Sequence, residues 1–403
     1  MLARLLTRAG DHAWGLAIPL ALMVAAPGTM RPLAAYYLMT RLAVVLAMPQ
    51  LGRWIDEADR LDVVRAGIAL EVAGVIAAAL LFGALAPASG LVPAVIAAGV
   101  VAQVGATMMA VVLPGRWVPA LFESDALARV NSRLKQCDLI SEVAAPVAAG
   151  SLMAFASSPA APYRGFHIVA LVNLASFALE YALLAHLYRA QPALAVPSPA
   201  PHPTQPPTAS AFRTFLAQPT LPVMLAYGLL WFTVLTPHGA LLTGFLKIQW
   251  KLDEQMLGLV RGVGALCGLA PTLFYARTVR AFGIRATAAA CLVAQVAALV
   301  LACLSLRHQT TLAAALFVVA LMTSRVGLYG FVLAEVQIFQ ENVPDAIRGR
   351  VGAAASSYNN ALGLAIYAAA LFFPAPADFP LLAWASCASV ALAASLVTAW
   401  ALR

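Results

Sequence analysis

Three polar residues follow one face of the first apolar segment of the chain. Thr7, Asp11 and Trp14 are spaced i, i+4 and i+7, and this spacing places them on the same side of a helix. The segment RAGDHAWGLAIPLALMV is otherwise apolar enough to lie in lipid. A carboxylate in such a segment is costly unless it is paired, protonated or bound to a cation, so Asp11 is a candidate functional residue.

A second polar face lies in HIVALVNLASFALEY, where Asn173, Ser176 and Glu180 are spaced i, i+3 and i+7. Glu71 stands alone in GIALEVAGV. Carboxylate, amide and hydroxyl oxygens are the ligands that hard and borderline divalent cations prefer. Two structural alternatives remain open: Asn and Ser can serve only as hydrogen bonds between helices, and Glu71 can pair with Arg41.

A histidine in the second half of the chain interrupts another apolar segment. In YGLLWFTVLTPHGALLTGF the residues Pro237, His238 and Gly239 lie near the middle of the segment. Proline removes a backbone donor, so we expect a broken helix, and a histidine at such a break is a candidate ligand. The alternative is a hydrogen-bonded histidine at a structural kink.

Charged residues also gather on the expected cytoplasmic side. We interpret them as a gate that closes when the two halves meet, with ordinary loop charges as the alternative. The gate residues are Asp56, Asn131, Lys135, Asp138, Glu142, Arg348 and Arg350.

These residues must be positioned by membrane-spanning helices. Of the 403 residues, 62% are hydrophobic and only 10% are charged, with a mean hydropathy of +0.86, which excludes a soluble domain. Apolar stretches of spanning length predict an all-α membrane protein with about twelve transmembrane helices. The stretches are 9–28, 32–52, 60–84, 90–114, 126–156, 163–187, 217–246, 254–278, 283–305, 309–336, 346–373 and 379–402.

The loops give the organisation and orientation. Residues 190–213 are rich in Pro, Ala and Ser and predict an extended cytoplasmic linker. The linker separates a six-helix half, 1–189, from a second, 214–403, which is the major facilitator architecture. Most of the 25 basic residues fall in the expected inner loops and at both ends, so both termini are predicted to be cytoplasmic. The net charge of +8 therefore reflects topology and does not indicate nucleic-acid binding.

Together these motifs resemble ferroportin, the iron exporter, and its bacterial homologues, over nearly the whole chain. The matching stretches are GDHAW at 10–14, GRWIDEADRL at 52–61, ARVNSRLKQCDLISEVAAPVAAG at 128–150, NLASFALEYALL at 173–184, LTPHG at 235–239, LKIQ at 246–249 and SRVGLYGF at 324–331.

The resemblance implies export of divalent metal, Fe²⁺ first, with Co²⁺, Zn²⁺, Mn²⁺ and Ni²⁺ as alternates, in exchange for protons. It implies metal ligands at Asp11, Thr7, Asn173, Ser176 and the main chain of Phe177, and at His238 in the second half. It also implies a calcium site that activates transport, with ligands at Glu71, Glu180, Asn173 and Asp11.

The chain departs from the vertebrate members at several positions. Gly15 stands where they have a histidine on the first helix, and Ile366 where they have one on the eleventh. Their helix 7 cysteine has no counterpart, so hepcidin is not expected as a partner. Glu71 stands where the family has a glutamine, which adds a carboxylate to the implied calcium site.

We expect a monomer in a bacterial plasma membrane, without a bound organic cofactor. The competing interpretation is a major facilitator permease for an organic solute or drug. A membrane-embedded enzyme is not favoured, because the sequence has no clustered catalytic aspartates, no P-loop and no HExxH motif.

Overall fold

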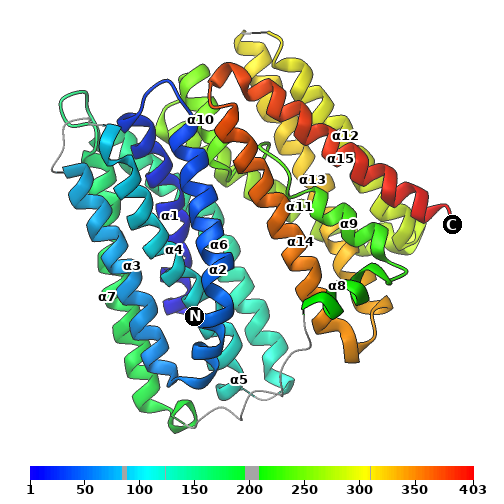
Figure 1. The fold of residues 1–403 in the computed structure, drawn as a ribbon, viewed down its shortest axis with the longest axis horizontal. Helices are drawn as coiled ribbons and strands as arrows, with labels where there is room; N and C mark the ends of the chain where they lie inside the picture. Colours follow the sequence, from blue (N-terminus) through cyan, green and yellow to red (C-terminus); the bar gives the residue numbers. More distant parts are fainter. Residues whose placement is uncertain (84–88, 123, 196–207, 309) are drawn as a thin grey trace. The chain divides into compact units, whose positions relative to one another are not determined.

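The computed structural model describes residues 1–83, 89–122, 124–195, 208–308 and 310–403. These ranges form fifteen α-helices with short 3₁₀ or π turns (Figure 1). In chain order the α-helices are α1 (Leu2–Ala25), α2 (Arg31–Glu57), α3 (Arg60–Gly83), α4 (Val92–Val112), α5 (Val118–Leu121), α6 (Ser124–Ala156), α7 (Arg164–Ala190), α8 (Thr208–Leu216), α9 (Leu221–Leu229), α10 (Ala240–Gln249), α11 (Glu254–Phe282), α12 (Ile284–Ser305), α13 (Thr311–Asn342), α14 (Asp345–Phe372) and α15 (Phe379–Ala401).

The prediction of an all-α membrane protein is confirmed. Each predicted apolar stretch coincides with one helix, except the seventh, which is divided between α9 and α10. Within the described ranges, eight helices are long and apolar enough to cross a membrane.

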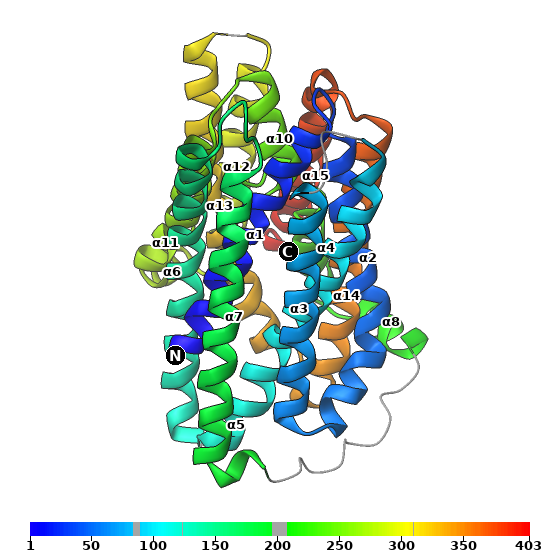
Figure 2. The same cartoon turned by 90° about the vertical axis from the view of Figure 1, so that its left-hand side faces the viewer.

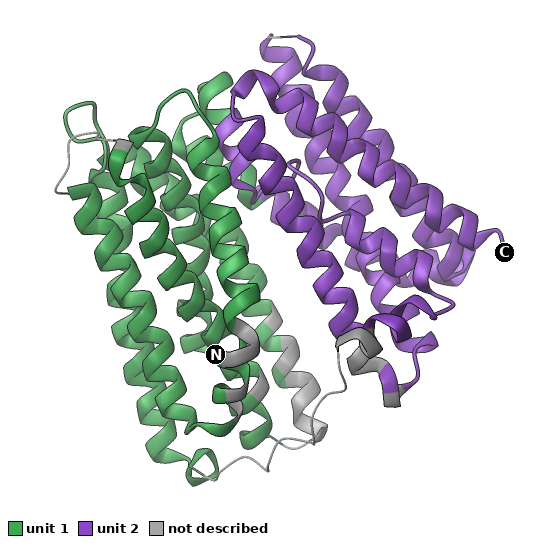
Figure 3. Ribbon diagram, in the orientation of Figure 1, with its two compact units in different colours: residues 1–202, 246–262 green, residues 203–245, 263–403 purple. Residues whose placement is uncertain are grey.

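The chain divides into two compact units (Figure 3). Unit 1 comprises Met1–His202 and Leu246–Gly262, and unit 2 comprises Pro203–Phe245 and Val263–Arg403. Residues 246–262 belong to the second half of the sequence but pack with the first. Their contact is close: the backbone of Gly258 lies against the carbonyl of Pro146 on α6.

Helix α1 lies in the core of unit 1. It packs against α6 and α7 and also contacts α2 and α4. Helix α3 packs against α4 and α7, and Figure 2 shows α3 and α7 side by side. The part of α1 from Leu16 to Leu22 is almost completely buried, because its apolar side chains face neighbouring helices on all sides.

Helices α1 and α7 approach each other closely at Gly10. A β-carbon at this position would clash with Oδ1 of Asn173 and would lie 3.6 Å from Oγ of Ser176. A glycine is therefore needed at this point, because only its bare backbone lets the amide of Asn173 lie against α1.

In unit 2 the backbone is not helical between α9 and α10, at the position where Pro237 predicts a break. Buried backbone groups in lipid need partners, and neighbouring helices supply them. The amide of Val234 donates to Oγ of Ser386 on α15 (3.0 Å), and Nη2 of Arg325 on α13 donates to the carbonyl of Leu235 (3.1 Å). Both Ser386 and Arg325 are buried. The break is thus held in place by side chains from two other helices.

We expect Gly10→Ala to destabilise the protein by about 1–3 kcal/mol, because the added methyl group must displace Asn173. Thermal unfolding of the detergent-solubilised protein measures this. The matched control is Gly15→Ala on the same helix, where an added β-carbon meets nothing within 4 Å. Equal melting temperatures for the two variants would contradict the close packing at Gly10.

We expect Ser386→Ala to cost about 1–3 kcal/mol, because it leaves the buried amide of Val234 without its acceptor. The control is Ser395→Ala on the same helix, whose exposed hydroxyl donates only to the carbonyl of Ala391. The same thermal unfolding experiment applies. If Ser386→Ala and Ser395→Ala have the same melting temperature, Ser386 does not stabilise the break.

Candidate functional site

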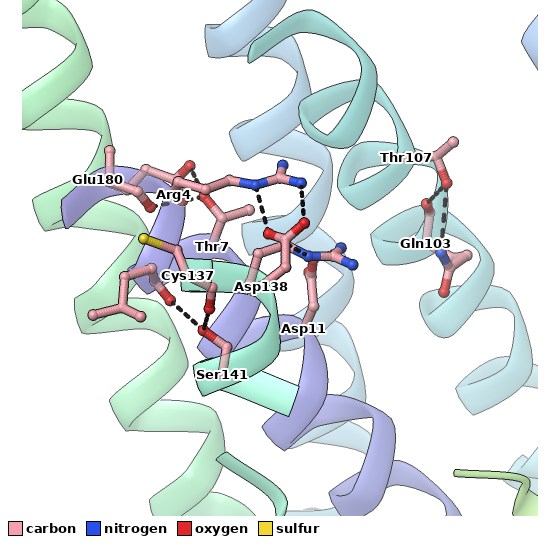
Figure 4. Close-up of polar contacts among 12 residues, drawn as sticks. Arg4, Thr7, Asp11, Gln103, Thr107, Cys137, Asp138, Ser141 and Glu180 are labelled. Carbon is pink, nitrogen blue, oxygen red and sulfur yellow. Dashed lines mark hydrogen bonds and ion pairs between the residues drawn. The ribbon is translucent and has the colours of Figure 1, made fainter. Parts of the chain in front are cut away.

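The polar face of α1 lies inside unit 1, where it meets charged groups from α6. Nη1 of Arg8 lies 3.0 Å from Oδ2 of Asp11. Arg4 binds Asp138 on α6 through two hydrogen bonds of 2.8 and 3.0 Å (Figure 4). Nε of Arg8 also lies 3.5 Å from Oδ1 of Asp138. Two arginines and two aspartates therefore form one network between α1 and α6.

A cavity of about 200 Å³ opens beside Asp11. Helices α1, α2, α3, α4 and α7 all contribute to its lining. The polar and charged lining residues are Arg8, Asp11, Glu71, Gln103, Thr107 and Asn173, and the aromatic ones are Trp14, Tyr36, Tyr37 and Phe177. This set combines carboxylate, amide and hydroxyl oxygens with aromatic walls, which suits a small cation and not a large apolar solute.

Glu71 is the most isolated charged group in this cavity. Only 2% of its surface is exposed, and neither carboxylate oxygen has a hydrogen-bond partner among the described residues. The alternative of a pair with Arg41 is therefore wrong for this structure. Asp11 and Glu180 are close enough to act on Glu71 electrostatically. A buried carboxylate with acidic neighbours requires a proton or a cation.

Thr7 and Glu180 contact each other across α1 and α7. The hydroxyl of Thr7 donates to Oε1 of Glu180, and the carbonyl of Ala3, at 3.0 Å, is its other acceptor. Glu180 is fully buried, and its Oε2 has no partner among the described residues. Neither Thr7 nor Glu180 lines the cavity beside Asp11. The structure thus places Thr7 with the predicted calcium ligand Glu180 and not directly with Asp11.

Asn173 connects this cavity to a second one of similar volume. The second cavity is apolar and is lined by α1, α6 and α7, including Gly10, Asn173 and Ser176. The hydroxyl of Ser176 donates to the carbonyl of Asn173 (2.7 Å). Asn173 and Phe177 therefore join Asp11 and Glu71 at the first cavity, whereas Ser176 lies beside the second.

The described residues contain no group of three or more His, Cys, Asp and Glu side chains gathered as a metal cluster. A cation at Asp11 would therefore be held by few carboxylates, with amide, hydroxyl and main-chain oxygens completing the set. Such a mixed oxygen set is consistent with a site that binds and releases its ion.

His238 lies in unit 2, at the break between α9 and α10. Its neighbour Pro237 is buried against Gly264 on α11. The packing is so close that a β-carbon at Gly264 would lie 2.7 Å from the proline ring. The histidine itself is partly buried. The break therefore presents His238 from a fixed, non-helical backbone.

The predicted gate is described only in part. Asp138 and Glu142 on α6 are partly buried, and Asp138 binds Arg4. The hydroxyl of Ser141, one turn from Asp138, donates to its own helix at Cys137 (2.8 Å) and approaches the carbonyl of Leu5 on α1 (3.3 Å). The remaining gate side chains lie outside the described residues: Asp56, Asn131, Lys135, Arg348 and Arg350.

Sequence reasoning missed four residues of this region. Arg4 and Arg8 are two of the basic residues near the N-terminus that indicate topology, and they also share the polar face of α1 at i and i+4. Gln103 and Thr107 line the cavity, and the hydroxyl of Thr107 donates to the carbonyl of Gln103 (2.8 Å). Their spacing of four residues in an otherwise apolar helix was the available signal.

The chain is similar to known proteins over nearly its whole length. The chain matches the family model Ferroportin1 (FPN1) over residues 1–205 and 204–390. It is 32% identical to Ferreportin of Bdellovibrio bacteriovorus, over 100% of this chain and 94% of that protein.

Solved structures show the same similarity. A bacterial homologue of the iron transporter ferroportin superposes with a TM-score of 0.88 at 32% identity, covering 100% of this chain and 97% of the other. The nucleoside transporter NupG, at 13% identity, shares the fold alone, with a TM-score of 0.70 over 99% and 98% of the two chains. The fold is that of major facilitator transporters, and the chain belongs to the ferroportin family of metal transporters.

Proposed function

We propose that this chain exports divalent metal ions, Fe²⁺ first, across a bacterial plasma membrane by alternating access, and that protons move in the opposite direction. The observation that carries the proposal is the cavity beside Asp11, where carboxylate and amide oxygens from α1, α3 and α7 converge. The named relatives support the choice of metal, because one is described as a homologue of an iron transporter.

Asp11 precedes the linker in the sequence and His238 follows it, and we propose both as metal ligands. Asp11 is 19% exposed at its side chain, so it is open to an ion from the cavity. The histidine supplies a nitrogen ligand from the α9–α10 break. Two sites that differ in donor type allow different affinities in the two halves.

Proton coupling follows from the same ligands. A carboxylate and an imidazole bind metal only when they are deprotonated. Loading a metal ion therefore displaces protons, and releasing it lets them return. We propose this competition as the link between metal export and proton entry.

Calcium is proposed as an activating ion in the same half. The residues fit such an ion, because Glu71 has two unpartnered buried oxygens and Glu180 has one. The proposed ligands are Glu71, Asn173 and Asp11, which line one cavity, and Glu180, which does not line it and would have to approach the other three. Bound calcium would neutralise acidic side chains that otherwise repel one another at this position.

We expect Asp11→Ala and His238→Ala each to lower Co²⁺ or Fe²⁺ flux in proteoliposomes to about a tenth of the wild-type rate or less, because each removes a metal ligand. An internal pH dye records the opposing proton movement, which should fall with the metal flux. Controls are Asp62→Ala on α3 and His186→Ala on α7, both exposed. If the wild type shows no metal flux with or without calcium, the alternative function, a permease for an organic solute, is favoured instead. Proton coupling that is unchanged in Asp11→Ala would overturn Asp11 as the coupling residue.

We expect Glu71→Gln to weaken the activation of flux by calcium about tenfold in calcium concentration, because it removes one ligand charge. Metal flux at saturating calcium should remain. The matched control is Asp62→Asn, an exposed carboxylate on the same helix. An unchanged calcium requirement in Glu71→Gln would exclude Glu71 from the activating site.

A further inference from the structure

Arg8 lies between two carboxylates that differ in their role. Its Nη1 is 3.0 Å from Asp11, and its Nε is 3.5 Å from Asp138. Arg8 also lines the cavity with Asp11, Glu71 and Asn173. The guanidinium group therefore already contacts both the proposed metal ligand and a second carboxylate.

Arg4 has the same charge and comes from the same helix face, but it is placed differently. Both of its hydrogen bonds go to Asp138, its side chain is only 10% exposed, and it does not line the cavity. This two-point contact fixes Asp138 beside α1. Asp138 is thus a stationary second partner for Arg8, and Arg4 is a natural control for it.

We propose that Arg8 is a tethered cation that binds both Asp11 and Asp138 in the metal-free protein and is held by Asp138 alone when a metal ion takes Asp11. The inference rests on the proposed function, since it assigns a role within the same metal site. The guanidinium and a metal ion compete for the same carboxylate, so each must leave before the other binds.

This exchange keeps Asp11 compensated in both states. A buried carboxylate that loses its partner is strongly disfavoured, and an empty site without Arg8 would leave Asp11 in that condition. With Arg8 present, release of the metal is followed by return of the guanidinium. Arg8 thereby weakens metal binding and favours release, which is what a carrier needs after each export step.

The competition contrasts with the situation at Glu71. No described cationic group binds the Glu71 carboxylate, so Arg8 competes with an ion only through Asp11. An ion held mainly by Glu71 therefore meets less competition than one held mainly by Asp11.

The test is the binding of Co²⁺ to purified full-length protein, measured by isothermal titration calorimetry. Because Arg8→Gln removes the competitor, we expect the Kd for Co²⁺ to fall about fivefold, the scale of one partly exposed ion pair. Arg8→Lys retains a charge of the same sign and should return the Kd toward the wild-type value. Asp138→Asn removes the second partner and should raise the Kd.

Arg4→Gln is the matched control, because it removes an equal charge from the same network without touching Asp11. Arg4→Gln also frees Asp138 to attract Arg8, so we expect its Kd to fall, but by clearly less than the Kd of Arg8→Gln. In flux measurements Arg8→Gln should lower both KM and the maximal rate, since tighter binding slows release. If Arg8 had only a structural role, Arg8→Gln would instead raise the Kd for Co²⁺ and lower the melting temperature.

Two results would overturn the proposal: a Kd in Arg8→Gln that is unchanged or higher, or equal tightening in Arg4→Gln and Arg8→Gln, which indicates a general charge effect. These are distinct from failure of the proposed function itself. If the wild type binds no Co²⁺, the proposed metal site itself is wrong. If the wild type binds Co²⁺ in a way that Asp11→Ala abolishes, while Arg8→Gln changes nothing, only the tethered-cation inference fails.

Discussion

The arrangement of unit 1 depends on the cost of burying carboxylates in an apolar helix bundle. Asp11, Glu71 and Glu180 come from three helices and influence one another electrostatically. Each is treated differently: Asp11 is held by Arg8, Glu180 accepts a hydrogen bond from Thr7, and Glu71 has no partner among the described residues. This gradation ranks the three groups by how much each gains from an added cation.

Close backbone packing is the second condition for the site. Gly10 lets Asn173 lie directly against α1, so the amide that lines the cavity is held from behind by a helix backbone. The same residue connects the polar cavity to the apolar one beside Ser176. The amide is therefore positioned by packing against α1, and the hydroxyl of Ser176 on its own helix also donates to its Oδ1 (3.4 Å).

Unit 2 meets a different constraint, because the break between α9 and α10 exposes backbone groups that a regular helix would satisfy internally. Ser386 and Arg325 replace those missing bonds. Arg325 is an arginine that could be mistaken for a substrate ligand, yet its described contact is with a backbone carbonyl. The two units thus use arginines for different ends: in unit 1 the partly exposed Arg8 compensates a carboxylate, and in unit 2 the buried Arg325 completes a broken helix.

The sequence by itself determined the helix positions, the faces of α1 and α7 that carry oxygen ligands, and the break at Pro237. These follow from apolar length, from the 3.6-residue period and from the missing amide of proline, all of which are local properties. It also pointed to Asp11, Asn173 and Glu71, and the family resemblance added Phe177; the structure brings these four residues to one cavity. Only the tertiary structure decided that Thr7 pairs with Glu180, that Ser176 lies beside another cavity and that Gln103 joins the site from α4. It also decided that Arg8 holds Asp11 while Arg4 holds Asp138. Periodicity fixes the direction in which a side chain leaves its own helix, whereas its partner depends on which helix packs opposite and at what height.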